Sequence, residues 1–183
     1  MSKVCVFLAD GFEEIEGLTV VDVLRRAGVE TVMVSVMESR QITGSHGILI
    51  EADEMFDEAK MKDADMLVLP GGMPGTLNLK AHEGLRKLLL SFDREGKYLS
   101  AICAAPTVLS ELGLLKGKNA CAYPSFEEAL DCARVMQIPV VTDGHITTGR
   151  GMGAAIPFAL RLTELLCGKD KAEEVRKSIV FEG

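Results

Sequence analysis

Cys103 stands where the sequence best suits nucleophilic chemistry. A short apolar run from Tyr98 to Ile102 ends at this cysteine, and small residues, a proline and a helical pattern from Thr107 to Leu112 follow it. The pattern predicts a strand, a sharp turn and a helix, with the thiol at the turn. The start of a helix carries partial positive charge and free N–H groups, so we expect a lowered thiol pKa and a reactive thiolate. The alternative is a packed cysteine, because a free cysteine is often a small apolar core residue.

Glu16 is the candidate partner of this thiol. It lies about one turn into a predicted helix that ends at Ala27. If that helix begins beside Cys103, a protonated Glu16 can donate to a thiolate, and an ionised one can act as a general base for a substrate proton. The alternative is an ordinary carboxylate at the start of a helix, which is what we expect of Glu13 and Glu14.

Gly71 and Gly72 follow a buried strand and leave backbone N–H groups accessible. Together with the N–H of Ala104 they can form an oxyanion hole, although a tight turn without a ligand explains them equally well. A second glycine-rich stretch, 149–154, reads G-x-G-x-x-A before a helix. It precedes the last helices rather than following the first strand, so we interpret it as close packing and not as a dinucleotide site.

The elements that must position these groups alternate between strands and helices. The strands are apolar throughout, which predicts one α/β domain over residues 1–183 with a parallel sheet covered on both faces. Ligands of such sheets bind beyond the carboxyl ends of the strands, where three of the features above fall. The expected strands are Val4–Ala9, Glu30–Val36, Met66–Leu69, Tyr98–Ile102, Ile138–Thr142 and Ile146–Thr148, with a hairpin over Gln41–Glu51; the expected later helices are Glu83–Arg94, Ala155–Cys167 and Ala172–Lys177.

Composition excludes several classes of function. The net charge of −7 argues against nucleic acid or an anionic membrane as partner. No apolar run approaches the roughly 20 residues that span a bilayer, and the short apolar start meets acidic residues at once, unlike a signal peptide. Five cysteines without C-x-x-C spacing make a disulfide framework or a zinc site improbable and favour a reducing cytoplasm. These cysteines are Cys5, Cys103, Cys121, Cys132 and Cys167.

The three histidines show no metal-binding spacing, and we expect no metal site. His82 opens a predicted surface helix, where we expect it to be solvated. His145 follows a strand and His46 lies in the edge hairpin. We interpret all three as structural or exposed residues rather than as catalytic ones.

Five motifs, in order, closely resemble the ThiJ/PfpI superfamily, and most of all its DJ-one branch, over Val4 to about Lys177. The resemblance implies a flavodoxin-like three-layer sandwich, a homodimer, no cofactor and a nucleophile elbow at Cys103. It implies Glu16 as the partner carboxyl, and Gly72 and Ala104 as oxyanion donors. The motifs are Glu13–Glu16, Val21–Gly28, Leu69–Gly72, Ala101–Pro106 and Thr147–Gly151.

The sequence departs from the family pattern at three positions. Tyr123 precedes Pro124 where the DJ-one branch has a histidine, and a phenol is a poor base at neutral pH. Ala104 replaces the histidine that follows the cysteine in the peptidase branch, so peptidase activity loses support. His46 stands where the DJ-one branch has an arginine. Tyr123, His46 and Arg150 are therefore our candidates for a substrate pocket.

Two functions use this site. In the first, Cys103 attacks the aldehyde of a small 2-oxoaldehyde or glycated group and a hydroxy acid is released, with no metal or nucleotide. In the second, oxidation of Cys103 is itself the output, as in a redox sensor or stress-protection protein. A third interpretation, a binding module with a merely packed cysteine, predicts an ordinary thiol pKa.

Overall fold

The computed structural model describes residues 1–182, which fold around one seven-stranded sheet. The strand order is β10-β11-β7-β6-β1-β2-β5, and every neighbouring pair is parallel except β10 with β11. This confirms the predicted α/β fold with a mostly parallel sheet. The strands are β1 (Lys3–Leu8), β2 (Glu30–Ser35), β5 (Glu54–Met55), β6 (Met66–Leu69), β7 (Tyr98–Ile102), β10 (Val140–Asp143) and β11 (Ile146–Gly149).

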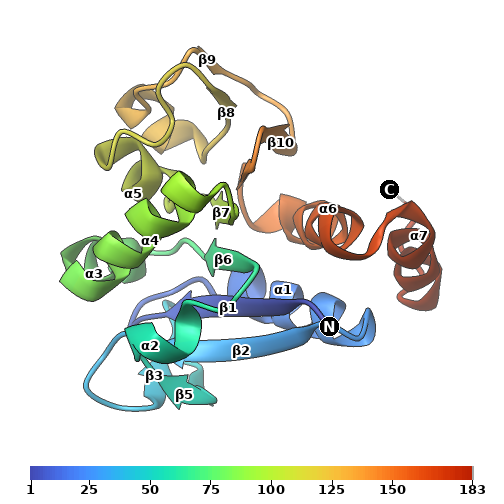
Figure 1. The fold of residues 1–183 in the computed structure, drawn as a ribbon, viewed down its shortest axis with the longest axis horizontal. Helices are drawn as coiled ribbons and strands as arrows, with labels where there is room; N and C mark the ends of the chain where they lie inside the picture. The colour runs from blue at the N-terminus through green and yellow to red at the C-terminus, as the bar shows by residue number, and fades with distance from the viewer. Residues whose placement is uncertain (183) are drawn as a thin grey trace.

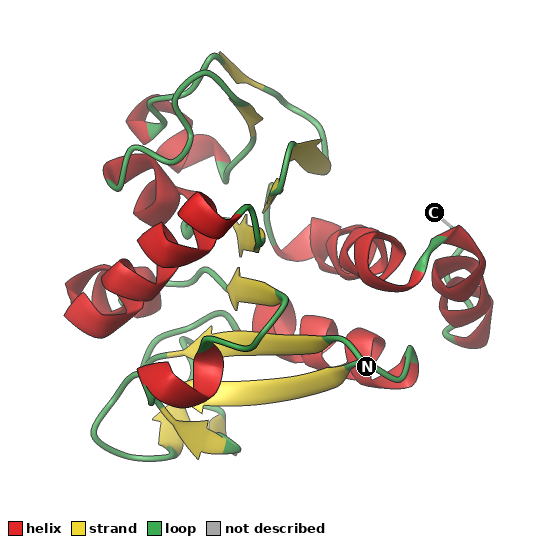
Figure 2. Ribbon diagram, in the orientation of Figure 1, coloured by secondary structure: helices red, strands yellow, loops and turns green. Residues whose placement is uncertain are grey.

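Helices cover both faces of the sheet and complete three layers (Figures 1 and 2). Strand β1 shows why its sequence is apolar throughout: Val6 packs with the core of α1 and α6, whereas Phe7, next in the chain, packs with the core of α4 and α5. The helices of the first face are α1 (Glu14–Arg26), α6 (Ala155–Cys167) and α7 (Lys169–Ser178); those of the second are α2 (Glu58–Met61), α3 (Gly75–Ala81), α4 (Glu83–Glu95) and α5 (Pro106–Glu111).

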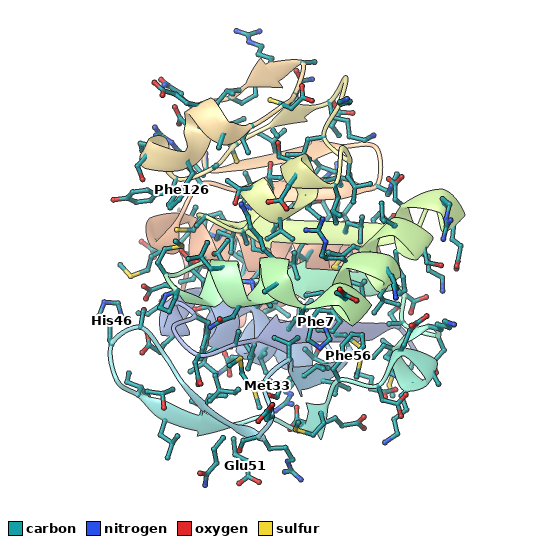
Figure 3. The ribbon with its side chains drawn as sticks, turned by 90° about the vertical axis from the view of Figure 1, so that its left-hand side faces the viewer. Phe7, Met33, His46, Glu51, Phe56 and Phe126 are labelled. Atoms are coloured by element: carbon teal, nitrogen blue, oxygen red, sulfur yellow. The ribbon has the colours of Figure 1, made fainter. Side chains whose placement is uncertain are left out.

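Smaller elements surround the sheet. The predicted hairpin over residues 41–51 is confirmed as β3 and β4, and Figure 3 shows His46 on the loop between them, at the edge of the molecule. The sequence did not predict the parallel pair β8 and β9, the 3₁₀ helix between these strands, or the 3₁₀ helix that precedes α6. These elements are β3 (Gln41–Thr43), β4 (Leu49–Glu51), β8 (Asn119–Ala120), β9 (Arg134–Val135), η1 (Pro124–Ala129) and η2 (Met152–Ala154).

His82 is not the solvated residue that we expected. Its Nδ1 atom accepts a hydrogen bond from the Leu85 N–H at 3.0 Å, which caps the start of α4. Its ring lies 4.5 Å from that of Phe56, which in turn lies 6.1 Å from Phe7 (Figure 3). Burial lowers the pKa of His82, so this histidine serves the fold.

None of the helices within residues 1–182 is long and apolar enough to cross a bilayer.

Candidate active site

The parallel sheet brings four chain segments to one edge. Strands β1, β6, β7 and β11 are neighbours that run in the same direction, so the turns after their carboxyl ends meet there. Those turns carry the segment before α1, the two glycines after β6, Cys103 and Arg150. The structure therefore gathers residues that lie up to about 140 positions apart in the sequence.

Cys103 adopts a left-handed backbone conformation, with φ of 63°, between β7 and α5. Such a conformation costs a non-glycine residue about 1–2 kcal/mol, so neighbouring contacts must hold it. Two of them do: the Cys103 N–H donates to the Gly149 carbonyl at 2.9 Å, and the Cys103 carbonyl accepts from the Tyr123 N–H at 2.9 Å. The bend has the strained strand–turn–helix geometry of the nucleophile elbow that the family resemblance implies.

Glu16 reaches the same place from the first turns of α1. Its side chain is 1% exposed, and Oε2 accepts a hydrogen bond from the Gly71 N–H at 2.9 Å. The other oxygen, Oε1, is buried and has no hydrogen-bond partner among the described residues. The Cys103 thiol lies beside the carboxyl and acts to lower its pKa. Gly71 must lack a side chain here, because a Cβ atom would lie 2.7 Å from both Cys103 Cβ and Glu16 Oε2.

The N–H groups of Gly72 and Ala104 both act on the Cys103 sulfur and favour its anion. Gly72 can present its N–H in this way because it adopts φ of +87°, and a Cβ atom there would lie 2.3 Å from the Glu13 nitrogen. Two convergent N–H donors beside a nucleophile have the arrangement of an oxyanion hole. Cys103, Glu16, Gly72 and Ala104 are thus brought together at one point.

The direction of the thiol pKa differs from our expectation. Burial raises the pKa of the Cys103 thiol to about 12, and the neighbouring Glu16 carboxylate adds to this shift. The N–H groups of Gly72 and Ala104 oppose it. Burial raises the pKa of Glu16 to about 7, despite the Gly71 N–H and Cys103. The expectation of a lowered thiol pKa was wrong because it considered the helix start alone. The nearest ionisable group is an acid, and α5 has only six residues.

The two groups therefore behave as one acid pair. The pair releases one proton near neutrality and holds the second to high pH, so one negative charge is shared between sulfur and carboxylate. The Gly71 N–H stabilises that charge on Glu16, whereas Gly72 and Ala104 stabilise it on Cys103. This arrangement can move a proton from sulfur to carboxylate without a net change of charge.

Glu14 is buried, which the sequence did not predict. Its carboxylate accepts from the His46 N–H at 2.8 Å and lies 2.9 Å from His46 Nδ1. Burial opposes ionisation, but hydrogen bonds from the His46 side chain and from the backbone outweigh it and lower the pKa of Glu14 to about 2. Glu14 thereby anchors the loop between β3 and β4, and no feature of the sequence pairs it with a residue 32 positions away.

The acidic residues and His46 also meet a geometric condition for metal binding. Glu13, Glu14 and His46 each place one possible ligand atom within 4.8 Å of the others. His46 Nδ1 is already paired with Glu14 and lies 3.7 Å from Glu13 Oε2. The ring of His46 is thus already engaged by Glu14, and this pairing raises the pKa of His46.

The three candidates for a substrate pocket do not lie together. Tyr123 and Arg150 line one cavity of about 440 Å³ beside the Cys103 backbone. His46 lies instead on the β3–β4 loop, with 67% of its side chain exposed (Figure 3).

In the glycine-rich stretch, 149–154, a Cβ atom at Gly149 would lie 2.9 Å from the side chains of Ile102 and Phe158, whereas one at Gly153 would meet nothing within 4 Å. Close packing therefore explains the first glycine of that stretch but not the last.

A comparison with models of protein families identifies the family of this chain. The model of the DJ-1/PfpI family matches residues 2–165. This chain belongs to the DJ-1/PfpI family. The flavodoxin-like fold and the resemblance drawn from the sequence are thereby confirmed.

Relatives in the DJ-1/PfpI family are similar over nearly the whole chain. The Drosophila melanogaster protein dj-1beta is 37% identical over 183 residues, 98% of each chain. An oxidized DJ-1 structure from Toxoplasma gondii has a TM-score of 0.94 at 34% identity and covers 100% of both chains. A protein named as a deglycase from Pyrococcus abyssi is 32% identical over 90% of this chain and 99% of its own.

Some family members are longer. The DJ-1 homolog B of Arabidopsis thaliana is 38% identical over 98% of this chain, but the match spans only 41% of the plant protein. The chain thus spans less than half the length of that relative.

Proposed function

We propose that this protein is a cofactor-independent cysteine enzyme that converts small 2-oxoaldehydes into 2-hydroxy acids. The observation that carries the proposal is that the buried Glu16 carboxyl and the Cys103 side chain meet at Gly71, where an added Cβ atom would lie 2.7 Å from Glu16 Oε2 and from Cys103 Cβ. Membership of the DJ-1/PfpI family and a relative named as a deglycase support a carbonyl substrate. A glycated group presents a related carbonyl and is the second substrate class of this proposal.

The reaction begins with activation of the thiol. Glu16 takes the thiol proton, and the Cys103 thiolate attacks the aldehyde carbon of the substrate, so that a C–S bond forms and the carbonyl π bond breaks. Negative charge develops on the former aldehyde oxygen. The N–H groups of Gly72 and Ala104, which act on the neighbouring Cys103 sulfur, can donate to this oxygen and stabilise it.

The second stage moves hydrogen between the two substrate carbons. After protonation of its oxygen, the hemithioacetal loses the proton on its former aldehyde carbon to Glu16, and a proton returns to the neighbouring ketone carbon. The result is a 2-hydroxy thioester. Water then cleaves the C–S bond and releases the 2-hydroxy acid and the thiol. The aldehyde carbon is oxidised and the ketone carbon is reduced, so water is the only co-reactant required.

The test is lactate formation from methylglyoxal in the absence of glutathione. We expect the wild-type protein to form lactate and the Cys103→Ser variant to lose at least about 10³-fold in kcat/KM, since the hydroxyl cannot be ionised by this pair. A wild-type rate no faster than that of Cys103→Ser contradicts the proposal. Circular dichroism of both proteins shows whether the variant keeps its fold.

A redox role is the second candidate for the same site. Cys103 is partly accessible, whereas Cys5 and Cys121 are buried, and the same N–H groups can hold the oxygens of a sulfinate. Mass spectrometry after mild peroxide treatment tests this role. We expect Cys103 to be oxidised first, and earlier oxidation of Cys132 or Cys167 contradicts it.

A further inference from the structure

The cavity beside Cys103 is larger than a three-carbon substrate needs. Its volume is about 440 Å³, within the range of roughly 300–1,000 Å³ that is typical of sites for ligands the size of drugs. Most of its wall is formed by Tyr123, Met152 and three prolines, among them Pro157. A methyl group of methylglyoxal would leave nearly all of this apolar space unfilled.

The cavity is attached directly to the backbone of the nucleophile. The Tyr123 N–H donates to the Cys103 carbonyl, and Arg150 follows Gly149, whose carbonyl accepts from the Cys103 N–H. The tyrosine ring lies close to Gly151, where an added Cβ atom would be 3.3 Å from it. These contacts fix the wall relative to the Cys103 backbone, so the cavity adjoins the turn that carries the thiol.

The wall exposes apolar surface that a ligand would cover. Tyr123 is 48% exposed and Met152 is 52% exposed, although both line the cavity. Contact with an apolar group would remove this surface from water, which is favourable. The cavity thus suits an apolar tail rather than a polar one.

The charge in the cavity is already balanced. Arg150 Nη2 lies 3.4 Å from Glu127 Oε1, and the other oxygen of Glu127 lies 3.3 Å from Gln137 Nε2. An anionic ligand would therefore meet a carboxylate beside the guanidinium. An uncharged tail avoids this carboxylate.

We propose that this cavity, which we call the tail subsite, binds the aromatic or branched apolar tail of a larger 2-oxoaldehyde whose aldehyde carbon reaches Cys103. This inference rests on the function proposed above and names its substrate class.

The experiment compares phenylglyoxal, which forms mandelate, with methylglyoxal. The readout is the ratio of the two kcat/KM values, because it cancels effects on folding and on the thiol. Gly153 lines the cavity and a Cβ atom there meets no atom within 4 Å, so Gly153→Leu fills the tail subsite without a clash at that atom. We expect the phenylglyoxal-to-methylglyoxal ratio to fall at least about tenfold in Gly153→Leu, as for a blocked apolar subsite.

Matched variants separate the wall from general effects. Met152→Ala should lower the same ratio about threefold to tenfold by removing apolar contact. Met55→Ala should leave it within twofold of wild type, because Met55 is a partly exposed methionine on β5, at the far edge of the sheet.

The outcomes distinguish the two proposals. If methylglyoxal is converted and the ratio is unchanged in Gly153→Leu and Met152→Ala, the tail subsite is wrong and the proposed function stands. If neither aldehyde is converted, the proposed function fails. Calorimetry with acetophenone then tests the tail subsite by itself. If acetophenone binds wild type and its affinity falls at least about tenfold in Gly153→Leu, the cavity is supported as an aryl site. Equal affinity for the two proteins, or no binding to either, overturns it.

Discussion

At the scale of single residues, the shared proton of Glu16 and Cys103 sets the pH dependence of the proposed reaction. The pair loses its first proton near pH 7, because burial raises the pKa of Glu16 to about that value. Only after that loss does the pair contain a base that can take the thiol proton. We therefore expect kcat/KM for methylglyoxal to rise with pH to a plateau above about pH 7.

Replacing Glu16 by Gln removes the proton acceptor. The Cys103 thiol must then ionise to solvent, so the rising limb should move to higher pH and kcat/KM at pH 7 should fall by about 10²–10⁴-fold. Glu30→Gln, which changes an exposed glutamate at the start of β2, should leave the profile unchanged. A profile of Glu16→Gln that superimposes on that of wild type contradicts the shared proton.

The sequence predicts which residue types form the site but not their electrostatics. Cys103 is marked by the end of an apolar strand, and Glu16 by its place in the first helix, so both follow from local patterns. The raised pKa of the thiol could not be predicted from such patterns, because it depends on a carboxylate 87 positions away and on burial. The burial of Glu14 depends likewise on a partner from another element.

At the scale of elements, the Glu14 carboxylate ties α1 to the loop between β3 and β4. The folded state lowers the pKa of Glu14 to about 2, so the unfolded chain binds more protons than the folded one below the ordinary pKa of a glutamate. This contribution to stability is present above that ordinary pKa and is lost as the pH falls toward 2. Because its partners are backbone and His46 donors, we expect Glu14→Gln to lower the free energy of unfolding at pH 7 by about 2 kcal/mol.

The measurement is urea unfolding of wild type and Glu14→Gln between pH 2.5 and 7, read by circular dichroism. The difference between the two proteins should shrink as the pH falls, and Glu30→Gln should track wild type at pH 7. Hydrogen exchange should show faster exchange at the amide of His46 in Glu14→Gln, since that N–H donates to Glu14. A difference that is constant over the whole pH range contradicts the account.

The large elements and the β3–β4 hairpin follow from the sequence, whereas the other short elements do not. The central strands are continuous apolar runs, and α1, α4 and α6 have clear helical spacing. Helix α3 was missed because it begins directly after Pro70–Pro74, a run of prolines and glycines that is typical of a turn. Strands β8 and β9 have two residues each, too few for an alternating pattern, and tertiary contacts define them.

At the scale of the whole molecule, an apolar surface other than the tail subsite is also uncovered. We define the α1 groove by Ile15, Leu18, Ile48, Ile156, Ile179 and Val180, which line a hollow of about 630 Å³ between α1, the β3–β4 loop and the end of α7. Ile15 is 51% exposed and Val180 is 79% exposed. Contiguous apolar surface of this kind marks an interface, and the family resemblance implies a second copy of the chain as its occupant.

We propose that the α1 groove is the surface through which the protein forms a homodimer. Light scattering after size exclusion should give twice the chain mass of 19.7 kDa. Ile15→Glu should yield a monomer, because each copy would bury an unpaired carboxylate in the interface. Leu77→Glu is the matched control, since Leu77 is also 51% exposed but lies on α3, away from the groove. A monomeric wild type, or a dimeric Ile15→Glu, overturns the assignment.

Glu14 lines the same groove, so a dimer would also cover the side chain that anchors the β3–β4 loop. Ile15→Glu should therefore speed hydrogen exchange at the amide of His46.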